Sequence, residues 1–476
     1  MRRLWRLAAT TVVTVALLLA IQPAQAASPK LSVSPGVPVR GETFTVSGRL
    51  STKVARPVQL EYKSGKKWKK LASAKTTAKG RFSFTTTTTK SSLTLRVVAK
   101  KVKLKVGGKK KTFKKITTKS KRVKTRAPAL KAVGVSSGSG HTCALTGAGA
   151  AWCWGGNYQG QLGDGTRTDR LTAVKVKGLP GDVVAISAGR LHSCALTRSG
   201  TAWCWGLNES GQLGDGTATR RTTAVEVRGL TDLTAISAGG SRTCALDARG
   251  ATWCWGGAED PALSDRRIPV RNERLSGVAT VDVAEGTHAC AITKAGTALC
   301  WGQNDKGQIG DGTRIHRVTP VPVTGLSRAT SISGGQAHTC ALTAAGAVAC
   351  WGSSQALGNL GREAPGQVPG LTSGVRAVTA GEDHTCALTT AGTVKCWGDN
   401  GFDQIGKSDD SLAYLTRPKQ IPGLSRVVAL STGGKHNCAV LSGGAIKCWG
   451  SGLDGALGDG THKDRATPVY VKGFEG

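Results

Sequence analysis

All fourteen cysteines of this chain fall into seven pairs of one spacing, in which a cysteine and nine further residues precede Cys-Trp-Gly. Cysteines can form disulfides or bind metal ions, and geometry decides between the two. Within each pair the residues alternate around a short turn, such as Gly147-Ala-Gly149 between Cys143 and Cys153. An antiparallel hairpin over this turn places the two cysteines opposite each other, with Cα atoms about 4.5 or 5.5 Å apart. Because both distances suit a disulfide, we predict seven hairpins, each closed by its own bridge.

Each predicted bridge closes a loop of about ten residues. By restricting the entropy of the unfolded chain, it should stabilise the folded state by roughly 2–3 kcal/mol. The predicted pairs are Cys143 with Cys153, Cys194 with Cys204, Cys244 with Cys254, Cys290 with Cys300, Cys340 with Cys350, Cys386 with Cys396 and Cys438 with Cys448.

A histidine two residues before the first cysteine of a pair offers an alternative, because residues i and i+2 share a face of a strand. This histidine occurs in six repeats, as His141, His192, His288, His338, His384 and His436, and the third repeat has Arg242 instead. A structural zinc site needs four ligands, and each repeat offers only three. We therefore favour a hydrogen-bonding role between neighbouring repeats and predict no metal site.

The first cysteines of successive pairs lie 46 to 52 residues apart, and each repeat reads as four short strands. This period is typical of a radial array of blades. We expect an all-β fold, a seven-bladed β-propeller over residues 131–476. The first repeat lacks the leading Thr-Pro-Val strand that others have, and Thr467-Pro-Val469 follows the last repeat. We expect this C-terminal strand to complete the first blade and close the ring.

The N-terminus has the pattern of a secretory signal over residues 1–26. Arg2, Arg3 and Arg6 precede an apolar run, and Ala-Gln-Ala ends at residue 26. A retained membrane anchor is the alternative. We expect a secreted, extracellular or cell-wall-associated protein, in which the cysteines can oxidise.

Residues 28–131 carry nearly all of the positive charge, with 30 Lys and Arg against only Glu42 and Glu61. Alternating stretches such as Val58–Tyr62 and Leu93–Val97 predict short strands separated by turns. We expect a basic β-sandwich over residues 28–106, similar to the immunoglobulin-like modules of secreted bacterial proteins. A Lys-rich strand and linker over 107–130 would follow it.

A lysine cluster within this region predicts polyanion binding. Three of its lysines alternate with apolar residues on one strand, and five follow the Gly-Gly at 107–108. Such a surface attracts anionic polymers, although a solubilising charged face is the alternative. The cluster comprises Lys101, Lys103, Lys105, Lys109, Lys110, Lys111, Lys114 and Lys115. Candidate partners are an anionic cell-wall polymer or membrane surface. Extracellular nucleic acid is a further alternative that is not favoured, because the cluster lacks the aromatic interleaving that indicates single-stranded nucleic acid in particular.

The repeats resemble the regulator of chromosome condensation repeat family. The resemblance covers about residues 131–473 and rests on Gly-x-Asn-x-x-Gly-Gln-Leu/Ile-Gly-Asp-Gly-Thr together with His-x-x-Ala-Leu-Thr and Trp-Gly. It implies a seven-bladed propeller and, from the family's nuclear members, guanine-nucleotide exchange. The secreted beta-lactamase inhibitory protein II, which is similar to this repeat family, suggests inhibition of a secreted enzyme. The paired cysteines depart from the best-known members.

We expect the recurring aspartates and tryptophans of the repeats to have structural roles rather than to bind ligands. Asp164, Asp215, Asp311 and Asp459 lie in Asp-Gly turns without the ligand spacing of a calcium loop. The tryptophan of each Cys-Trp-Gly recurs in register, which favours packing between blades over a sugar-binding surface. Loops in repeats three, five and six diverge at 258–264, 353–357 and 400–404 and are candidates for partner recognition.

No catalytic set is apparent, and we expect neither an enzyme nor a cofactor. Glu285, Glu363, Glu382 and Asp383 are scattered among the repeats. We expect a non-enzymatic scaffold that binds an unknown protein partner on one propeller face. The alternatives are an inhibitor of a secreted enzyme, an enzyme with its active site at the central pore of the propeller, and an exchange factor.

Overall fold

The computed structural model describes residues 29–40, 42–125, 129–257, 266–353, 361–407 and 414–475. It divides into two compact units, Met1–Pro128 and Ala129–Gly476, which we call the basic unit and the ring unit and describe separately. The expected signal segment lies outside the described residues. Within those residues, no helix has the length and apolar character needed to cross a bilayer.

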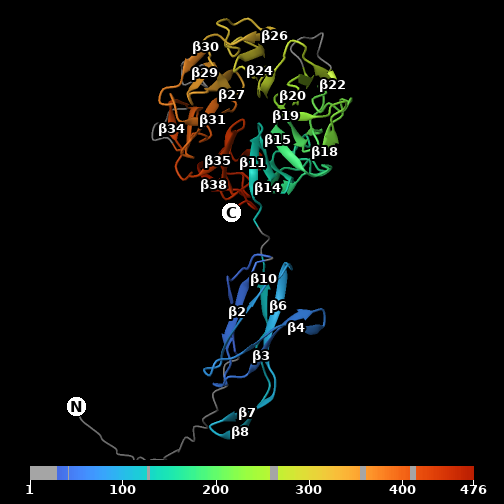
Figure 1. The fold of residues 1–476 in the computed structure, drawn as a ribbon, viewed down its shortest axis with the longest axis vertical. Helices are drawn as coiled ribbons and strands as arrows, with labels where there is room; N and C mark the ends of the chain where they lie inside the picture. Colours follow the sequence, from blue (N-terminus) through green and yellow to red (C-terminus); the bar gives the residue numbers. More distant parts are fainter. Residues whose placement is uncertain are drawn as a thin grey trace, which may run out of the picture. The chain divides into compact units, whose positions relative to one another are not determined.

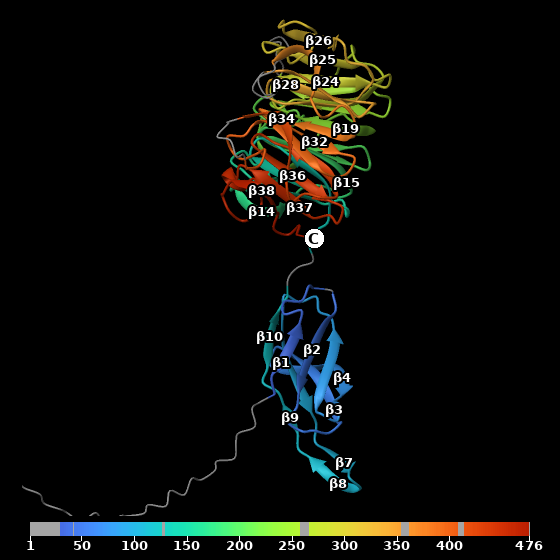
Figure 2. The same ribbon diagram turned by 90° about the vertical axis from the view of Figure 1, so that its left-hand side faces the viewer.

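The basic unit contains two antiparallel sheets that share one core (Figures 1 and 2). One sheet has the order β1-β2-β5, and the other has the order β10-β6-β3-β4 with β9 beside β6. The strands are β1 (Leu31–Ser34), β2 (Phe44–Arg49), β3 (Pro57–Ser64), β4 (Lys67–Lys75), β5 (Arg81–Thr86), β6 (Ser92–Ala99), β9 (Ile116–Thr117) and β10 (Lys121–Lys124).

Alternation of apolar and polar residues builds this core. Val46 on β2, Leu60 on β3 and Leu95 on β6 are fully buried, whereas the residues beside them in sequence are more exposed. Such a pattern is typical of two sheets with one solvated face each. The unit is therefore a small β-sandwich.

More of the residues beyond 106 form strands of the basic unit than the sequence predicted. β7 (Val102–Val106) pairs with β8 (Lys109–Phe113) as a separate hairpin, and β10 pairs with β6. Val123 on β10 is buried in the shared core, although lysines and arginine surround it in sequence. The segment 107–130 therefore contains an integral edge strand, and its description as a strand followed by a linker was incomplete.

The ring unit contains seven four-stranded antiparallel sheets, which we number one to seven along the chain. The first strand of each lies near the centre of the ring and the fourth lies at its rim (Figure 1). Sheet one has β11 (Ala132–Ser137), β12 (His141–Thr146), β13 (Ala151–Gly155) and β14 (Arg170–Lys175); sheet two has β15 (Val183–Ala188), β16 (His192–Thr197), β17 (Ala202–Gly206) and β18 (Arg221–Glu226); sheet three has β19 (Leu233–Ala238), β20 (Arg242–Asp247), β21 (Thr252–Gly256) and β22 (Arg266–Arg271); sheet four has β23 (Val278–Val283), β24 (His288–Thr293), β25 (Ala298–Gly302) and β26 (Arg317–Pro322).

The remaining three sheets follow the same order. Sheet five has β27 (Ala329–Gly334), β28 (His338–Thr343), β29 (Val348–Gly352) and β30 (Arg362–Gln367); sheet six has β31 (Val375–Ala380), β32 (His384–Thr389), β33 (Val394–Asp399) and β34 (Tyr414–Gln420); sheet seven has β35 (Val427–Thr432), β36 (His436–Leu441), β37 (Ile446–Gly450) and β38 (Arg465–Tyr470). A short 3-10 helix, η2 (Leu453–Gly455), precedes β38.

The hydrophobic core of the ring lies between neighbouring sheets. One cluster joins Cys194 and Cys204 of sheet two to Ala245 and Trp255 of sheet three. Each sheet thus depends on its neighbour to bury its face, as expected for stacked repeats.

The predicted closure by a C-terminal strand was wrong. β38, which contains Thr467-Pro-Val469, pairs with β37 in sheet seven, and sheet one is complete without it. The ring closes through packing of β11 against β35 and β36. Backbone bonds add to this contact, because Leu130 donates to Gly473 O and Ala132 donates to Gly444 O. The Thr-Pro-Val segment that was expected to begin a repeat is therefore the outer, fourth strand of the sheet before it.

Candidate functional site

The cysteine pairs lie where the hairpin argument placed them. Cys143 is opposite Cys153 in the register of β12 and β13, and the other six pairs follow the same register. Each pair has a Cα–Cα distance of 4.1 Å and is joined as a disulfide within one sheet. None of the seven bridges links two sheets, so other contacts must hold neighbouring sheets together.

Buried histidines make some of these contacts. His141 of sheet one lies 2.8 Å through Nε2 from Ser193 Oγ of sheet two, and the equivalent contact recurs around the ring. The other pairs are His192 with Thr243, His288 with Thr339, His338 with Thr385, His384 with Asn437 and His436 with Thr142. The predicted role between neighbouring repeats is confirmed. Among the described residues, no group of three or more His, Cys, Asp and Glu could hold a metal ion.

Burial keeps these imidazoles neutral. It lowers the pKa of His141 to about 3 and that of His192 to about 4. A neutral imidazole fits its neighbour, because the Ser193 hydroxyl donates to Gln161 O at 3.0 Å and can accept from Nε2 of His141.

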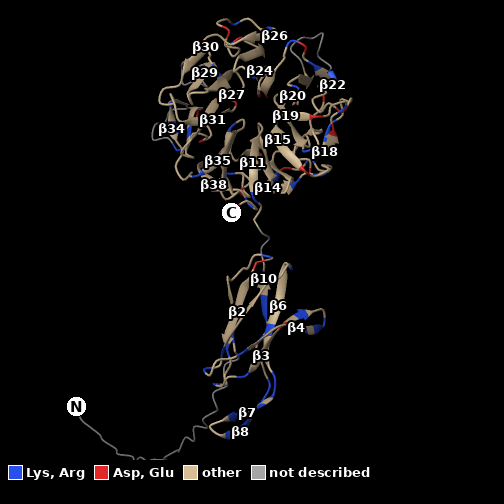
Figure 3. Ribbon diagram, viewed as in Figure 1, with Lys and Arg blue, Asp and Glu red and all other residues tan. Residues whose placement is uncertain are grey.

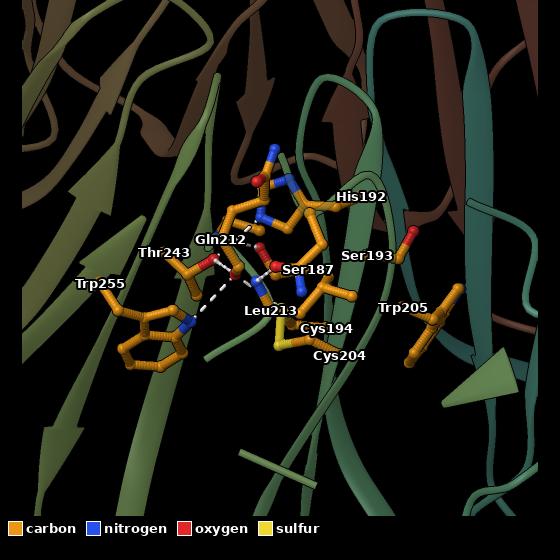
Figure 4. Close-up of a disulfide and its surroundings, with 12 residues drawn as sticks. Ser187, His192, Ser193, Cys194, Cys204, Trp205, Gln212, Leu213, Thr243 and Trp255 are labelled. Carbon is orange, nitrogen blue, oxygen red and sulfur yellow. Dashed lines mark hydrogen bonds between the residues drawn. A yellow bond between two sulfur atoms is a disulfide. The ribbon is translucent and has the colours of Figure 1, made fainter. Parts of the chain in front are cut away.

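At five of the joints between sheets, a single backbone carbonyl of the loop accepts from the tryptophan of the next sheet. In Figure 4, Gln212 O accepts from Thr243 Oγ1 at 2.9 Å and from Trp255 Nε1 at 2.9 Å. Gln212 belongs to the long loop of sheet two, whereas Thr243 and Trp255 belong to sheet three. The loop after the third strand therefore binds the next sheet, which supports the packing role predicted for the tryptophans.

The Asp-Gly turns hold these loops in shape. Asp164 accepts from Thr166 Oγ1 at 2.6 Å and from Arg170 Nε at 2.7 Å. Burial acts to raise the pKa of Asp164, but hydrogen bonds from Thr166 and Arg170 outweigh it and lower the pKa. The same contacts recur at Asp215, Asp311 and Asp459. With both carboxylate oxygens occupied, these aspartates are turn residues.

The eight predicted lysines gather on and beside the β7–β8 hairpin (Figure 3). All eight are exposed, and none forms an ion pair with an acidic residue in the described part of the chain. Lys105 lies directly opposite Lys110 in the register. Like charges at opposite positions destabilise a sheet. The free hairpin therefore carries a repulsion that a bound anion would relieve.

Arg56, which the sequence analysis did not single out, fixes the base of this hairpin. Its side chain is fully buried, and Nη2 donates to the carbonyl oxygens of Lys100 and Lys114, at 3.0 Å for the latter. The guanidinium carbon also lies 5.9 Å from the centre of the Phe113 ring. These two carbonyls flank the hairpin, so Arg56 positions the lysines.

Glu285 lines the central channel of the ring, and Glu382 and Asp383 lie close enough to influence its charge. Glu285 of sheet four accepts a hydrogen bond from Ser139 Oγ of sheet one, although the two lie on separate sheets. Burial, together with the charges of Glu382 and Asp383, raises the pKa of Glu285 to about 7, although the hydrogen bond from Ser139 acts in the opposite direction. The fourth acid, Glu363, instead pairs with Arg314 at 2.8 Å. Sequence alone contained no signal for this cluster.

A channel of about 190 Å³ adjoins Glu285 and is lined mainly by small and hydroxyl residues of the inner strands. Ser136 Oγ accepts from Ala188 N of the next sheet at 2.9 Å, and Asp282 takes the equivalent position in sheet four, where it accepts from Gly334 N at 2.8 Å. The lining thus bonds sheet to sheet.

Comparison with known proteins identifies the repeats. The profile of an RCC1-like domain matches residues 103–372, and that of the regulator of chromosome condensation (RCC1) repeat matches residues 375–404. The Protein RCC2 homolog of Danio rerio is 47% identical over 81 residues, which are 17% of this chain and 16% of that protein. The RCC1 domain-containing protein 1 of Homo sapiens is 41% identical over 88 residues, 18% of this chain and 23% of that protein. The chain thus spans less than a quarter of the length of these relatives.

Solved structures agree on the fold. Prp20p from Saccharomyces cerevisiae has a TM-score of 0.61 at 21% identity, covering 72% of this chain and 87% of that chain. Yeast RCC1 (Prp20) bound to Kap60 has a TM-score of 0.60 at 20% identity, covering 72% and 85%. At such identity the likeness concerns the fold alone, and it confirms a β-propeller of these repeats.

Proposed function

This chain belongs to the regulator of chromosome condensation (RCC1) repeat family, and on that premise we propose that it is a binding scaffold. In this proposal the protein is secreted and non-enzymatic, and its seven sheets form a seven-bladed propeller that binds a macromolecular partner. The basic unit, an immunoglobulin-like sandwich, holds the protein on anionic polymers of the cell surface. The observation that carries the proposal is the exposed β7–β8 hairpin, whose lysines have no acidic partner among the described residues.

Electrostatics supports an extended anion rather than a single ion. The lysines alternate between both faces of the hairpin, since Lys103, Lys105 and Lys110 share one face and Lys109 and Lys111 the other. A polymer that contacts many of them releases many counterions, which makes binding strong at low salt and weak at high salt.

Retention of the full mature chain on immobilised inorganic polyphosphate tests the proposal. Changing Lys105, Lys109, Lys110 and Lys111 to Gln should abolish retention at a salt concentration where the parent protein is held. Changing Lys66, Lys67, Lys69 and Lys70 to Gln, near the exposed turn between β3 and β4, removes the same charge and is the matched control.

The control should remain bound. Equal loss in both variants would mean that net charge alone acts and would contradict a dedicated hairpin site. Vesicles containing an anionic phospholipid form a second arm, and binding to vesicles without binding to polyphosphate would replace the polymer by a membrane surface. No contact among the described residues favours enzyme inhibition or nucleotide exchange, so we propose neither.

A further inference from the structure

The first strands of the seven sheets surround the channel of about 190 Å³ at the centre of the ring (Figure 1). Every residue of its lining belongs to the described part of the chain. One position of these strands borders both the channel and the next sheet, and in six of the seven sheets it carries a hydroxyl group. We call these six residues the hydroxyl ring: Ser136, Ser187, Ser237, Ser333, Thr379 and Ser431.

Sheet four has a carboxylate, Asp282, at this position. Its Oδ2 atom accepts from Gly334 N at 2.8 Å, as Ser136 Oγ accepts from Ala188 N at 2.9 Å. A hydroxyl group is therefore enough for the contact between sheets. The second carboxylate oxygen of Asp282 has no hydrogen-bond partner among the described residues, and the side chain borders the channel. The additional negative charge thus faces the channel.

No positively charged side chain balances Asp282. The lining of the channel, all of it described, contains no lysine, arginine or histidine. Burial raises the pKa of Asp282 to about 6, although the hydrogen bond from Gly334 acts in the opposite direction. The carboxylate is therefore mostly ionised at pH 8, and a buried charge without a partner is unfavourable. A cation in the channel would relieve this cost.

Hydroxyl groups without partners lie across the channel from Asp282. Ser137 and Thr432 are each 7% exposed, and their oxygens have no hydrogen-bond partner in the described structure. They belong to sheets one and seven, which are the farthest from sheet four in the order of the ring. Thr379 of sheet six is a third hydroxyl group of this kind. An ammonium group donates three hydrogen bonds, so one carboxylate and two hydroxyl oxygens match it.

The next position along the first strands is mainly apolar. We call its four apolar residues in the channel lining the apolar collar: Ala188, Ala238, Val283 and Ala380. Successive residues of a strand lie about 3.3 Å apart, so the collar lies directly beside the hydroxyl ring. A charged head with an alkyl tail fits this arrangement. Since a cavity of about 150 Å³ holds benzene, the channel has room for an ammonium group and about four carbon atoms.

We propose that the channel binds a free linear alkylamine, with Asp282 as the counter-ion of its ammonium group and the apolar collar around its tail. Ser137 and Thr432 accept hydrogen bonds from the ammonium group. Beyond the collar, Glu285 of sheet four bonds to Ser139 of sheet one across the ring, which limits the length of the tail. The site is separate from the β7–β8 hairpin and goes beyond the proposed scaffold function.

Calorimetric titration of the full mature chain with butylammonium chloride, at pH 8 and constant ionic strength, tests the proposal. The parent protein should bind saturably. Asp282→Ser should weaken binding at least about tenfold, because a charge-assisted hydrogen bond contributes about that factor. This variant gives sheet four the serine that five other sheets carry, so it should retain the bond to Gly334 N and the melting temperature of the parent. Glu363→Gln, which removes one carboxylate at the rim, is the matched control and should bind as the parent does.

Methylammonium chloride tests the apolar collar with the parent protein alone. It should bind at least about tenfold more weakly than butylammonium, because each buried methylene contributes about a factor of four. Equal binding of the two amines, or equal binding of butylammonium by the parent and Asp282→Ser, would overturn the proposal. So would equally tight binding of lysine blocked at both termini, because a protein side chain would then be the ligand. The hairpin lysines take no part in this assay, so its result is independent of polyphosphate retention.

Discussion

The Nε2 atom of His436 lies 2.6 Å from Oγ1 of Thr142, which joins the last sheet of the ring to the first. The same type of contact joins His141 to Ser193 and His288 to Thr339 at interior joints. Trp154 Nε1 completes the closing joint by donating to Ala456 O at 2.9 Å. These side-chain bonds add to the packing and backbone bonds at the closing joint, and no exchanged strand is involved.

Thr142→Val should destabilise the protein by about 1–3 kcal/mol, because it leaves the buried imidazole of His436 without its partner. Denaturant unfolding at pH 7 measures the loss. Thr339→Val at an interior joint should cost a similar amount, and Thr112→Val on the exposed strand β8 should cost little. An unchanged unfolding midpoint for Thr142→Val would show that closure does not depend on this bond.

Phe474→Ala should cost about 3–5 kcal/mol, as is usual for a large buried aromatic residue. Phe474 is fully buried, its ring centre lies 6.1 Å from that of Trp154, and its carbonyl accepts from Ile446 N. Thermal unfolding provides the comparison, with Glu475→Ala at an exposed neighbouring position as the control. A melting temperature equal to that of the control would contradict the assigned packing of the C-terminus.

The hairpins were predictable because each depends on residues close in sequence. Cys143 and Cys153 are ten positions apart, and the alternation of the residues between them fixes which side chains face each other. Strand assignment to sheets was not predictable in this way. A tandem repeat has no intrinsic starting point, so Thr467-Pro-Val469 reads equally well as the first strand of one sheet or the last strand of another.

The sites formed by distant residues were also hidden. Ser139 meets Glu285 only because the ring brings sheets one and four to a common axis. Arg56 reaches Lys114 only because two parts of the basic unit fold together. The charge of the lysine cluster was visible in the sequence, since it depends on composition, but the residue that positions the cluster was not.

Stability should fall as the pH is lowered from about 6.5 toward 4, because unfolding restores an ordinary histidine pKa of about 6.5. Burial lowers the pKa of His338 to about 3 and that of His384 to about 4. The unfolded chain therefore binds more protons than the folded chain between about pH 4 and 6.5. The buried neutral histidines contribute their full stabilisation only above about pH 6.5. Burial also raises the pKa of Glu285 to about 7. This carboxyl group therefore lowers the stability of the folded state as the pH rises toward 7, which opposes the effect of the histidines.

Denaturant unfolding at several pH values between 4 and 7 tests this expectation. His338→Gln should be less stable than the parent at pH 7 and should show a shallower decline toward pH 4. The exposed His316 is the control, since His316→Gln should retain the parent's pH dependence. A flat profile in the parent would mean that these histidines are not buried as neutral groups.

The bridge between Cys244 and Cys254 should be the first to be reduced under native conditions. Cys254 is 8% exposed and lines a cavity of about 460 Å³ between sheets three and four, whereas every other cysteine is at most 2% exposed. Thiol–disulfide exchange requires access to sulfur, so access should set the order. Limited reduction, alkylation and peptide mass spectrometry identify the first labelled pair. Earlier labelling at any other pair would contradict this order.

The most direct test of the scaffold account is the salt dependence of polyphosphate binding. The logarithm of the binding constant of the parent protein should fall linearly with the logarithm of the salt concentration. The slope should become shallower by about three to four units when Lys105, Lys109, Lys110 and Lys111 are changed to Gln, since each phosphate contact contributes nearly one unit. An unchanged slope in that variant would mean that the β7–β8 hairpin does not bind the polymer.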